Sequence, residues 1–309
     1  MAQSTATILR IGTRGSPLAL VQARTVAARL AAALGAGEEA VELVVIRTSG
    51  DRIQDRPLAE VGGKGLFTKE IEEALLDKRI DLAVHSTKDM PTFSQPGLLL
   101  AACLEREDPR DAFISHKARS LDELPPGAAL GTASLRRQAI AKRARPDLNI
   151  VPLRGNVETR LRKLEAGEVD ATLLALAGLN RLGLTQHATR LMSAEEFLPA
   201  VGQGAIGIEA RVSDTRTREI LARINHADTS IAVACERAFL AELDGSCKTP
   251  IAGHATIAGD TVQFRGLIAR ADGSAAHDIA GTGSRKDAFN IGAEAGRQLK
   301  RLAGPGFLD

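Results

Sequence analysis

One cysteine of this chain stands where a ligand could reach it. Cys247 lies on a short loop between a predicted helix and a predicted strand, and a thiol on such a loop can act as a nucleophile or a covalent anchor. Cys103 and Cys235 lie in apolar or helical runs, where a thiol usually only packs. The wide spacing of the three cysteines argues against a disulfide framework or a zinc site. The six scattered histidines form no ligand pair, so we predict no metal.

A dense block of basic residues is the second feature that could do chemistry. Residues 136–163 hold nine Lys and Arg against Asp147 and Glu158, a local charge of +7 in a chain whose net charge is +2, which leaves −5 for the rest. Such a concentration favours a small polyanion held in a cleft. Single-stranded nucleic acid is disfavoured because the chain has no Trp or Tyr and the block has no Phe for base stacking. A duplex binder stays open as an alternative.

The first 200 residues alternate predicted strands and helices in two similar passages. The first passage has strands at 8–13, 41–48 and 80–85 and helices at 18–34 and 66–78. The second has strands at 128–131, 149–153 and 169–176 and helices at 134–145 and 157–166. Residues 75–83 also match residues 164–172 in their pattern of helix end, turn, Asp and strand start. This pattern predicts two α/β lobes built on parallel sheets, with a cleft between them.

Residues after about 225 change character. A helix at 228–243 precedes the Cys247 loop, and strands at 251–257, 262–269 and 275–280 are joined by tight turns, as in an antiparallel meander. A helix at 286–302 would cover one face. The fold class is therefore α/β, with two doubly wound lobes and a small C-terminal α+β domain that carries Cys247.

The polar residues that could bind a ligand follow the predicted strands. Helix N-termini favour anions, and arginine has a fork of donors that matches carboxylates. The alternative is that Arg136, Arg137 and Arg160 lie on solvated helix faces and bind no ligand. For His85 two interpretations stay open: a proton carrier, or a hydrogen-bonded structural histidine. The strand-end residues are Arg14, Ser16, Ser86, Lys88, Asp89, Thr132, Ser134, Arg136, Arg137, Arg154, Asn156, Asn180 and Arg181.

Eight sequence motifs, spread nearly from end to end, resemble the porphobilinogen deaminase (hydroxymethylbilane synthase) family of tetrapyrrole biosynthesis. Each motif alone is a modest signal, but eight in the family's order leave little room for coincidence. The motifs are RGSPLAL at 14–20, VGGKGLF at 61–67, HSTKDMP at 85–91, REDPRDAF at 106–113, GTASLRRQ at 131–138, LRGNV at 153–157, AGLNRLG at 177–183 and PAVGQGA at 199–205.

The resemblance implies a transferase that adds four porphobilinogen units, each with loss of ammonia, to a dipyrromethane cofactor on Cys247 and then releases hydroxymethylbilane. It implies lobes shaped like periplasmic binding proteins, with domains at 1–104 plus 201–222, 105–200 and 223–309. Asp89 would be the catalytic carboxylate, and the segment 50–65 could act as a lid. The cofactor would contact Ser86, Lys88, Asp89, Thr132, Ser134, Arg136 and Arg137, and the substrate Arg14, Ser16, Arg154, Arg160, Arg181 and Gln203.

Two positions depart from the family pattern. Ser246 stands where a second glycine often precedes the cysteine, and Glu60 stands where a basic residue is common. The first departure puts the loop geometry in doubt, and the second puts a contact between the lid and an anion in doubt.

The remaining expectations concern partners and location. The N-terminus has no signal-peptide pattern and no window is apolar enough to span a membrane, so we expect a cytoplasmic protein that is a monomer and binds neither nucleic acid nor membrane. Two other functions stay open: a cytosolic two-lobed anion-binding protein without catalysis, and an enzyme that uses Cys247 as a nucleophile in turnover.

Overall fold

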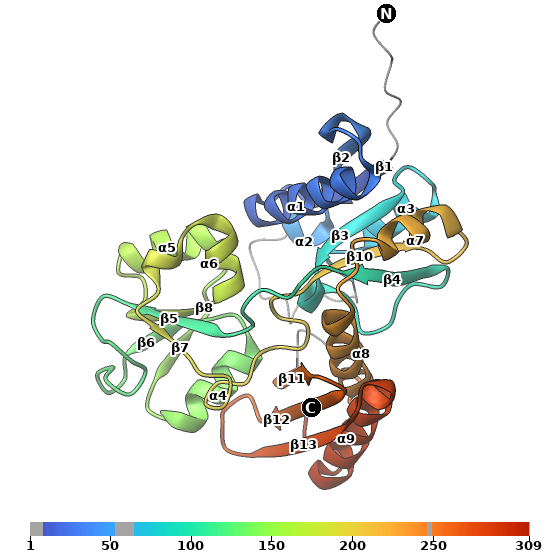
Figure 1. Cartoon of the computed structure of the whole chain (residues 1–309). Coiled ribbons are helices and arrows are strands. Elements are labelled where there is room, and N and C mark those ends of the chain that lie inside the picture. Colours follow the sequence, from blue (N-terminus) through green and yellow to red (C-terminus); the bar gives the residue numbers. More distant parts are fainter. Residues whose placement is uncertain (1–8, 53–64, 246–248, 309) are drawn as a thin grey trace, which may run out of the picture. The chain divides into compact units, whose positions relative to one another are not determined.

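A computed structural model describes residues 9–52, 65–245 and 249–308, which form an α/β fold with three sheets (Figure 1). The described chain divides into two compact units. The first consists of residues 9–52, 65–106 and 205–230, and the second of residues 107–204 with 231–245 and 249–308. The chain therefore leaves the first unit and returns to it later.

The first unit is built on a five-stranded sheet. Its order is β2 (Val41–Val45), β1 (Leu9–Thr13), β3 (Leu82–Ser86), β10 (Ile206–Arg211) and β4 (Leu98–Cys103). β1 runs parallel to β2 and β3, whereas β10 is antiparallel to β3 and β4. The helical segments are α1 (Pro17–Leu34), α2 (Ser49–Arg52), α3 (Lys69–Leu76), α7 (Thr215–Ala222), and the 3-10 turns η1 (Glu38–Ala40) and η2 (Thr87–Asp89).

The second unit contains a five-stranded sheet with the same pattern of strand directions. Its order is β7 (Asn149–Val151), β6 (Ala129–Gly131), β8 (Ala171–Ala175), β5 (Asp111–Ser115) and β9 (Arg190–Leu191). The predicted parallel pairing holds for β6 with β7 and β8, but the sheet is mixed, because β5 is antiparallel to β8 and β9 just as β10 is to its neighbours. The helical segments are α4 (Leu135–Ala144), α5 (Val157–Glu165), α6 (Leu176–Leu182) and the 3-10 turn η3 (Thr185–His187).

The second unit also includes the C-terminal sheet. It is the antiparallel meander β11 (Ile251–Ala258), β12 (Thr261–Ala269) and β13 (Ala276–Ser284), as the turns predicted. The rings of Phe239 and Phe264 pack with centroids 4.9 Å apart, and Leu267 joins the hydrophobic core beneath β6 and α4. The helical segments are α8 (Ala227–Glu242), α9 (Ala288–Ala303) and the 3-10 turn η4 (Arg285–Asp287).

The repeat detected in the sequence has a structural counterpart in each sheet. Asp81 and Asp170 each precede the middle strand of their sheet. The Asp81 carboxylate accepts from the backbone N–H of Arg10 at 2.9 Å, and that of Asp170 accepts from Ala129 at 2.7 Å. The backbone N–H of Asp81 also donates to the carbonyl of Arg10 at 2.9 Å, and that of Asp170 donates to the carbonyl of Ala129 at 2.8 Å. The same residue type therefore joins β1 to β3 in the first unit and β6 to β8 in the second.

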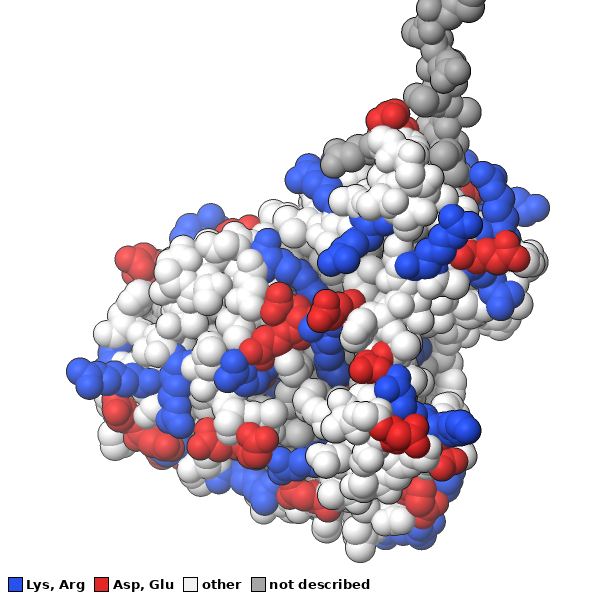
Figure 2. Space-filling model, in the orientation of Figure 1, with Lys and Arg blue, Asp and Glu red and all other residues white. Residues whose placement is uncertain are grey.

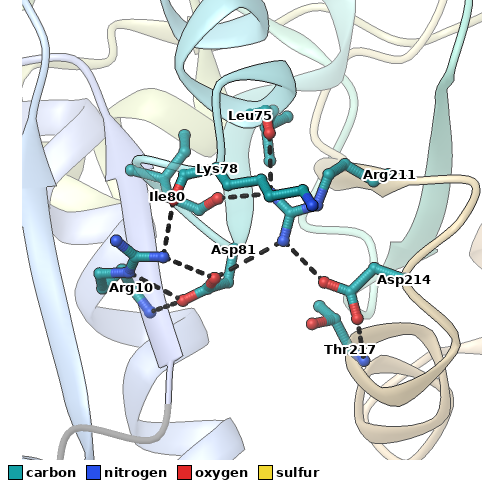
Figure 3. Close-up of polar contacts among 8 residues, drawn as sticks. All are labelled: Arg10, Leu75, Lys78, Ile80, Asp81, Arg211, Asp214 and Thr217. Atoms are coloured by element: carbon teal, nitrogen blue, oxygen red, sulfur yellow. Dashed lines mark hydrogen bonds and ion pairs between the residues drawn. The ribbon is translucent and has the colours of Figure 1, made fainter.

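Around Asp81 the contact widens into a network, shown in Figure 3. The Arg10 side chain donates to both carboxylate oxygens, and Arg211 lies 3.6 Å away while bonding to Asp214 at 2.7 Å. Arg211 also donates to the carbonyls of Leu75 and Ile80. Burial alone would raise the pKa of Asp81, but the hydrogen bonds from Arg10 more than offset this and hold it below its usual value. The network ties β1, β3, β10 and α7 together.

We predict that Asp81→Ala lowers the free energy of unfolding by about 1.5 kcal/mol at pH 7, allowing for the partial exposure of the pair. A depressed carboxyl pKa stabilises the fold above the unfolded value, near pH 4, and this contribution is lost as the pH falls through the folded value. The difference between wild type and variant should therefore shrink in acid. Chemical denaturation between pH 3 and 7 measures it. The exposed neighbour Asp77→Ala is the control, and equal effects of the two variants would contradict this role.

Candidate active site

A small pocket in the first unit collects several of the predicted site residues. Arg14 and Ser16 come from the turn after β1, and Ser86 and Asp89 from the end of β3 and the following η2 turn. The carboxyl ends of these parallel strands meet at one edge of the sheet, which brings the four residues together as expected. The full lining is Arg14, Ser16, Leu18, Ala19, Gln22, Phe67, Thr68, Val84, His85, Ser86 and Asp89.

Asp89 is the acidic residue in the lining of this pocket. Its side chain is half-buried and, within the described part of the chain, has no hydrogen-bond or ion-pair partner. Lys88 lies beside it in the same 3-10 turn and is also half-buried. A half-buried carboxylate in a pocket, with its lone pairs unused by the described residues, can accept hydrogen bonds from a ligand or face a positive charge on one.

The two serines of the pocket are held by neighbouring groups. Ser16 is the N-cap of α1, where its hydroxyl accepts from the N–H of Ala19 at 3.3 Å and Pro17 occupies the first turn. The Ser86 hydroxyl bonds to the side-chain amide of Gln22 at 2.9 Å. Gln22 was not among the predicted site residues, because it lies in the middle of an Ala-rich helix that reads only as packing.

Arg14 is engaged by residues that sequence reasoning did not connect with it. Its Nε donates to both oxygens of Asp51, at 3.1 and 3.2 Å, and its guanidinium lies 4.2 Å from the centre of the Phe67 ring. Burial would raise the pKa of Asp51, but the contacts with Arg14 and Thr48 hold it below its usual value. Asp51 thus shows that Arg14 can bind a carboxylate through two oxygens. Most of the predicted lid, residues 53–64, lies outside the described residues.

In the second unit, Asp111 joins three predicted site residues. Its buried carboxylate accepts from Arg136 at 2.6 Å, from Arg137 at 2.7 Å and from the Gln203 amide at 2.9 Å. Arg136 also donates to the Leu198 carbonyl at 2.8 Å. Burial alone would raise the pKa of Asp111, but the two guanidinium groups hold it far below its usual range. The interpretation of Arg136 and Arg137 as solvated helix residues is therefore wrong.

Asp111 is the main residue that the sequence reasoning missed. It lies in the motif at 106–113, but nothing local shows that its partners are 25 residues away on α4. One carboxylate between two guanidinium groups leaves a net charge of +1 in a buried place. The Nε atoms of both arginines are buried without a hydrogen-bond partner among the described residues. This pair of arginines therefore keeps both charge and donors for a further anion.

The other predicted residues of the second unit lie at helix starts and at the turns near Gln203. Ser134 and Asn156 are the N-caps of α4 and α5, and the Thr132 hydroxyl accepts from the Ser134 N–H at 3.1 Å. Arg154 is half-buried before α5, and Arg160 donates to the Gly155 carbonyl at 2.9 Å.

Arg181 and Asn180 lie on α6 and contact two different turns. Arg181 donates to the Gly204 carbonyl at 2.7 Å, and Asn180 donates to the Glu107 carboxylate at 3.0 Å. Burial lowers the pKa of Arg181, with Glu107 acting in the opposite direction. Arg181 and Gln203 are thus brought to the same short turn.

The basic block is less one-sided in space than in sequence. Besides Arg136 and Arg137, whose partner is Asp111, Arg143 pairs with Asp278 at 3.2 Å and Lys163 lies 3.9 Å from Glu168. Within the block, Arg145 pairs with Asp147 at 2.7 Å. On the face seen in Figure 2, Lys and Arg are interspersed with Asp and Glu. That face therefore shows no continuous positively charged surface of the kind that binds a nucleic-acid duplex.

The cysteines divide as the sequence predicted, as far as the structure describes them. Cys103 and Cys235 are buried, and burial raises the pKa of the Cys235 thiol to about 12. Such a thiol is protonated at neutral pH and packs as an apolar group. Cys247 and Ser246 lie outside the described residues, as does Glu60.

Two family models match the chain. That of the porphobilinogen deaminase dipyromethane cofactor-binding domain covers residues 9–219, and that of the porphobilinogen deaminase C-terminal domain covers residues 230–301. This chain belongs to the porphobilinogen deaminase family. Among curated relatives, the porphobilinogen deaminase of Nitrobacter hamburgensis is 59% identical over 96% of this chain and 94% of its own length. That of Nitrobacter winogradskyi is 58% identical over the same shares.

Porphobilinogen deaminases are transferases of tetrapyrrole biosynthesis, and the resemblance noted in the sequence is confirmed. Among solved structures, a nutrient-binding protein of Burkholderia cenocepacia bound to methionine is 18% identical, with 70% of this chain and 90% of that chain covered and a TM-score of 0.45.

We predict that Asp111→Asn destabilises the fold by about 3 kcal/mol, since it leaves two buried guanidinium groups without their counter-charge. The amide is nearly isosteric, so the loss reports charge and not volume. Denaturant unfolding at pH 7 measures it. Asp147→Asn, which removes the acidic partner of Arg145 at the surface, is the matched control and should change stability little. An Asp111→Asn protein as stable as wild type would show that the buried pair is not needed for folding.

Proposed function

We propose that this chain joins four porphobilinogen units, each with loss of ammonia, onto a covalent dipyrromethane primer and releases hydroxymethylbilane. The observation that carries the proposal is the pocket of the first unit. There the Asp89 carboxylate, which has no partner among the described residues, lies in one lining with the Arg14 guanidinium and two serine hydroxyls. An anion-binding protein needs the cation and the hydroxyls, but it has no evident use for a free carboxylate.

The reaction explains why a carboxylate belongs in such a pocket. Porphobilinogen loses ammonia from its aminomethyl group, and the carbon left behind is positively charged. Asp89 can offset that charge, accept hydrogen bonds from pyrrole N–H groups and take up the proton that the attacking ring carbon releases. Arg14 can hold a substrate carboxylate in the way it holds Asp51, by donating to both oxygens, if the substrate takes the place of Asp51.

The arginines of the second unit fit a ligand that carries several carboxylates. Each pyrrole has an acetate and a propionate arm, so a dipyrromethane brings four negative charges. Arg136 and Arg137 fit such a group, because Asp111 neutralises only one of their two charges and their buried Nε donors are unused within the described residues. We assign the cofactor to these arginines with Thr132, Ser134, Ser86, Lys88 and Asp89. The assigned substrate contacts are Arg14, Ser16, Arg154, Arg160, Arg181 and Gln203.

We further propose that Cys247 forms the thioether to the cofactor. When bound, the cofactor supplies the pyrrole carbon to which the first unit is added. The buried Cys103 and Cys235 are poor candidates, since neither thiol is accessible. The domains proposed to support this chemistry are residues 1–104 with 201–222, residues 105–200, and residues 223–309 with the cofactor cysteine.

The remaining features of the proposal concern context. Among the described helices, none is long and apolar enough to cross a membrane. We propose a cytoplasmic monomer whose partner is the small molecule porphobilinogen, with neither nucleic acid nor membrane as a ligand. The two departures from the family pattern, Ser246 and Glu60, do not remove a residue to which this proposal assigns a role.

We predict that Asp89→Asn lowers the turnover of porphobilinogen about a hundredfold, because the amide keeps the shape but not the charge that faces the developing cation. The fold and any bound pyrrole should persist. Product formation is followed by absorbance after oxidation to porphyrin, and circular dichroism checks the fold. The control Asp77→Asn changes an exposed acid of the same unit and should be fully active. Retained activity in Asp89→Asn would move the catalytic role to another residue.

We also predict that the purified protein carries two pyrrole units on Cys247. Its intact mass should exceed the mass of the sequence by that adduct, and Cys247→Ser should bring the mass back to the sequence value. Cys235→Ser is the control and should keep the adduct. With no Trp or Tyr in the chain, a near-ultraviolet band would independently report the pyrroles. An active wild type of unmodified mass would refute the covalent primer.

A further inference from the structure

A cluster of buried polar side chains lies against the pocket, and the proposed chemistry has not yet used it. His85 lines the pocket, and its Nε2 lies 3.4 Å from Oε2 of Glu209. The two side chains are 3% and 1% exposed. Neither of these atoms has a hydrogen-bond partner among the described residues, and the same holds for Glu72 Oε1 and the hydroxyls of Thr68 and Thr87. His85 Nε2 therefore lies within ion-pair distance of Glu209 but forms no hydrogen bond in the described structure.

The sheet explains why these residues meet. His85 lies on β3 opposite Gly207 of the antiparallel strand β10, and Glu209 lies opposite Ala83, two residues further along both strands. Residues two apart on a strand share a face, so His85 and Glu209 are diagonal neighbours on one face of the sheet. Glu72 reaches them from α3. The cluster is thus built from three elements of the first unit.

The charges around His85 come from four elements. Glu209 faces it from β10 and Glu72 from α3, while Asp89 of the η2 turn and Arg14 of the turn after β1 share its pocket. α1 contributes only Leu18, Ala19 and Gln22 to the lining. Burial raises the pKa of Glu72, the charge of Glu209 raises it further, and His85 acts in the opposite direction. Two buried carboxylates therefore lie beside one imidazole, so the cluster contains groups that can accept and release a proton next to the pocket.

We infer that His85, backed by Glu209 and Glu72, is a proton-exchanging residue that restores Asp89 to its ionised form after each addition. This inference rests on the proposed function. In one addition, the C–N bond of the protonated aminomethyl group breaks and ammonia leaves with the electron pair, which leaves a cationic methylene carbon. The free ring carbon of the pyrrole at the end of the chain attacks that methylene, a C–C bond forms, and the attacking ring carbon loses its proton. That proton passes to Asp89, then to His85, and ends on ammonia as ammonium. Four successive additions through one carboxylate require such a discharge after every step.

The first experiment is chemical rescue of His85→Ala. We expect the steady-state rate with porphobilinogen to fall at least tenfold, and to rise again with the concentration of added imidazole, which can carry the proton in place of the missing ring. His226→Ala is the control: His226 lies in the same unit, bonds to Thr229 at 2.9 Å and is not part of the pocket lining. It should neither slow the enzyme nor respond to imidazole. A normal rate in His85→Ala, or a slow rate that imidazole leaves unchanged in a folded protein, overturns the inference.

A second measurement keeps the test independent of that variant and of turnover. The six histidines of the chain are titrated by nuclear magnetic resonance in the intact wild type and in Glu209→Gln. We expect one histidine to titrate at a lower pH in the variant, because the neighbouring carboxylate is gone, and the pH profile of the rate to move in the same direction. If no histidine titration moves, the contact with Glu209 is not functional and the inference fails. A wild type that does not consume porphobilinogen would instead refute the proposed function.

Discussion

The second unit depends on one buried carboxylate. Asp111 has no exposed side-chain surface and holds two arginines that are themselves 5% and 6% exposed. An unpaired charge in such a place would cost several kcal/mol, so β5, the first turn of α4 and the turn at Gln203 must assemble together. The Leu198 carbonyl, which accepts from Arg136, adds the segment before that turn. The Asp111 carboxylate thus holds Arg136 and Arg137 in place, and the one positive charge that it does not neutralise is available to an anionic ligand.

Local sequence patterns predicted the parts of the fold that local physics decides. Ser16, Ser134 and Asn156 each cap a helix as their residue types indicate, and the Asp81 and Asp170 repeat appears in both sheets with the same two backbone bonds. The strands β4, β5, β9 and β10 were not predicted. β10 pairs with β3 across about 120 residues of chain, and a pairing over such a distance leaves no periodic trace in the strand itself. This is also why the antiparallel strands in each sheet were missed.

In the candidate site, too, local sequence patterns predicted some residues, whereas contacts between distant parts of the chain were missed. Arg14, Ser16, Ser86 and Asp89 could be predicted because each follows a strand, and the ends of neighbouring strands meet. The acidic partners of the site arginines could not be predicted in this way. Asp51 contacts Arg14 from 37 residues away, and Asp111 contacts Arg136 from 25 residues away. Charge counted along the sequence therefore overstated the positive field of the block at 136–163, because several of its counter-charges lie outside it.

Both units leave buried polar atoms without a hydrogen-bond partner among the described residues, and in both some of these atoms lie with proposed binding residues. In the second unit they include the Nε atoms of Arg136 and Arg137, whose other nitrogens donate to Asp111. In the first unit, Asp89 has no partner among the described residues, and His85 Nε2 and Glu209 Oε2 lie 3.4 Å apart without a hydrogen bond. A fold that only bound an anion would gain stability by replacing these groups with apolar ones, since unpaired buried polar atoms oppose folding. Their concentration against a single pocket is explained if protons and a transient positive charge pass through it.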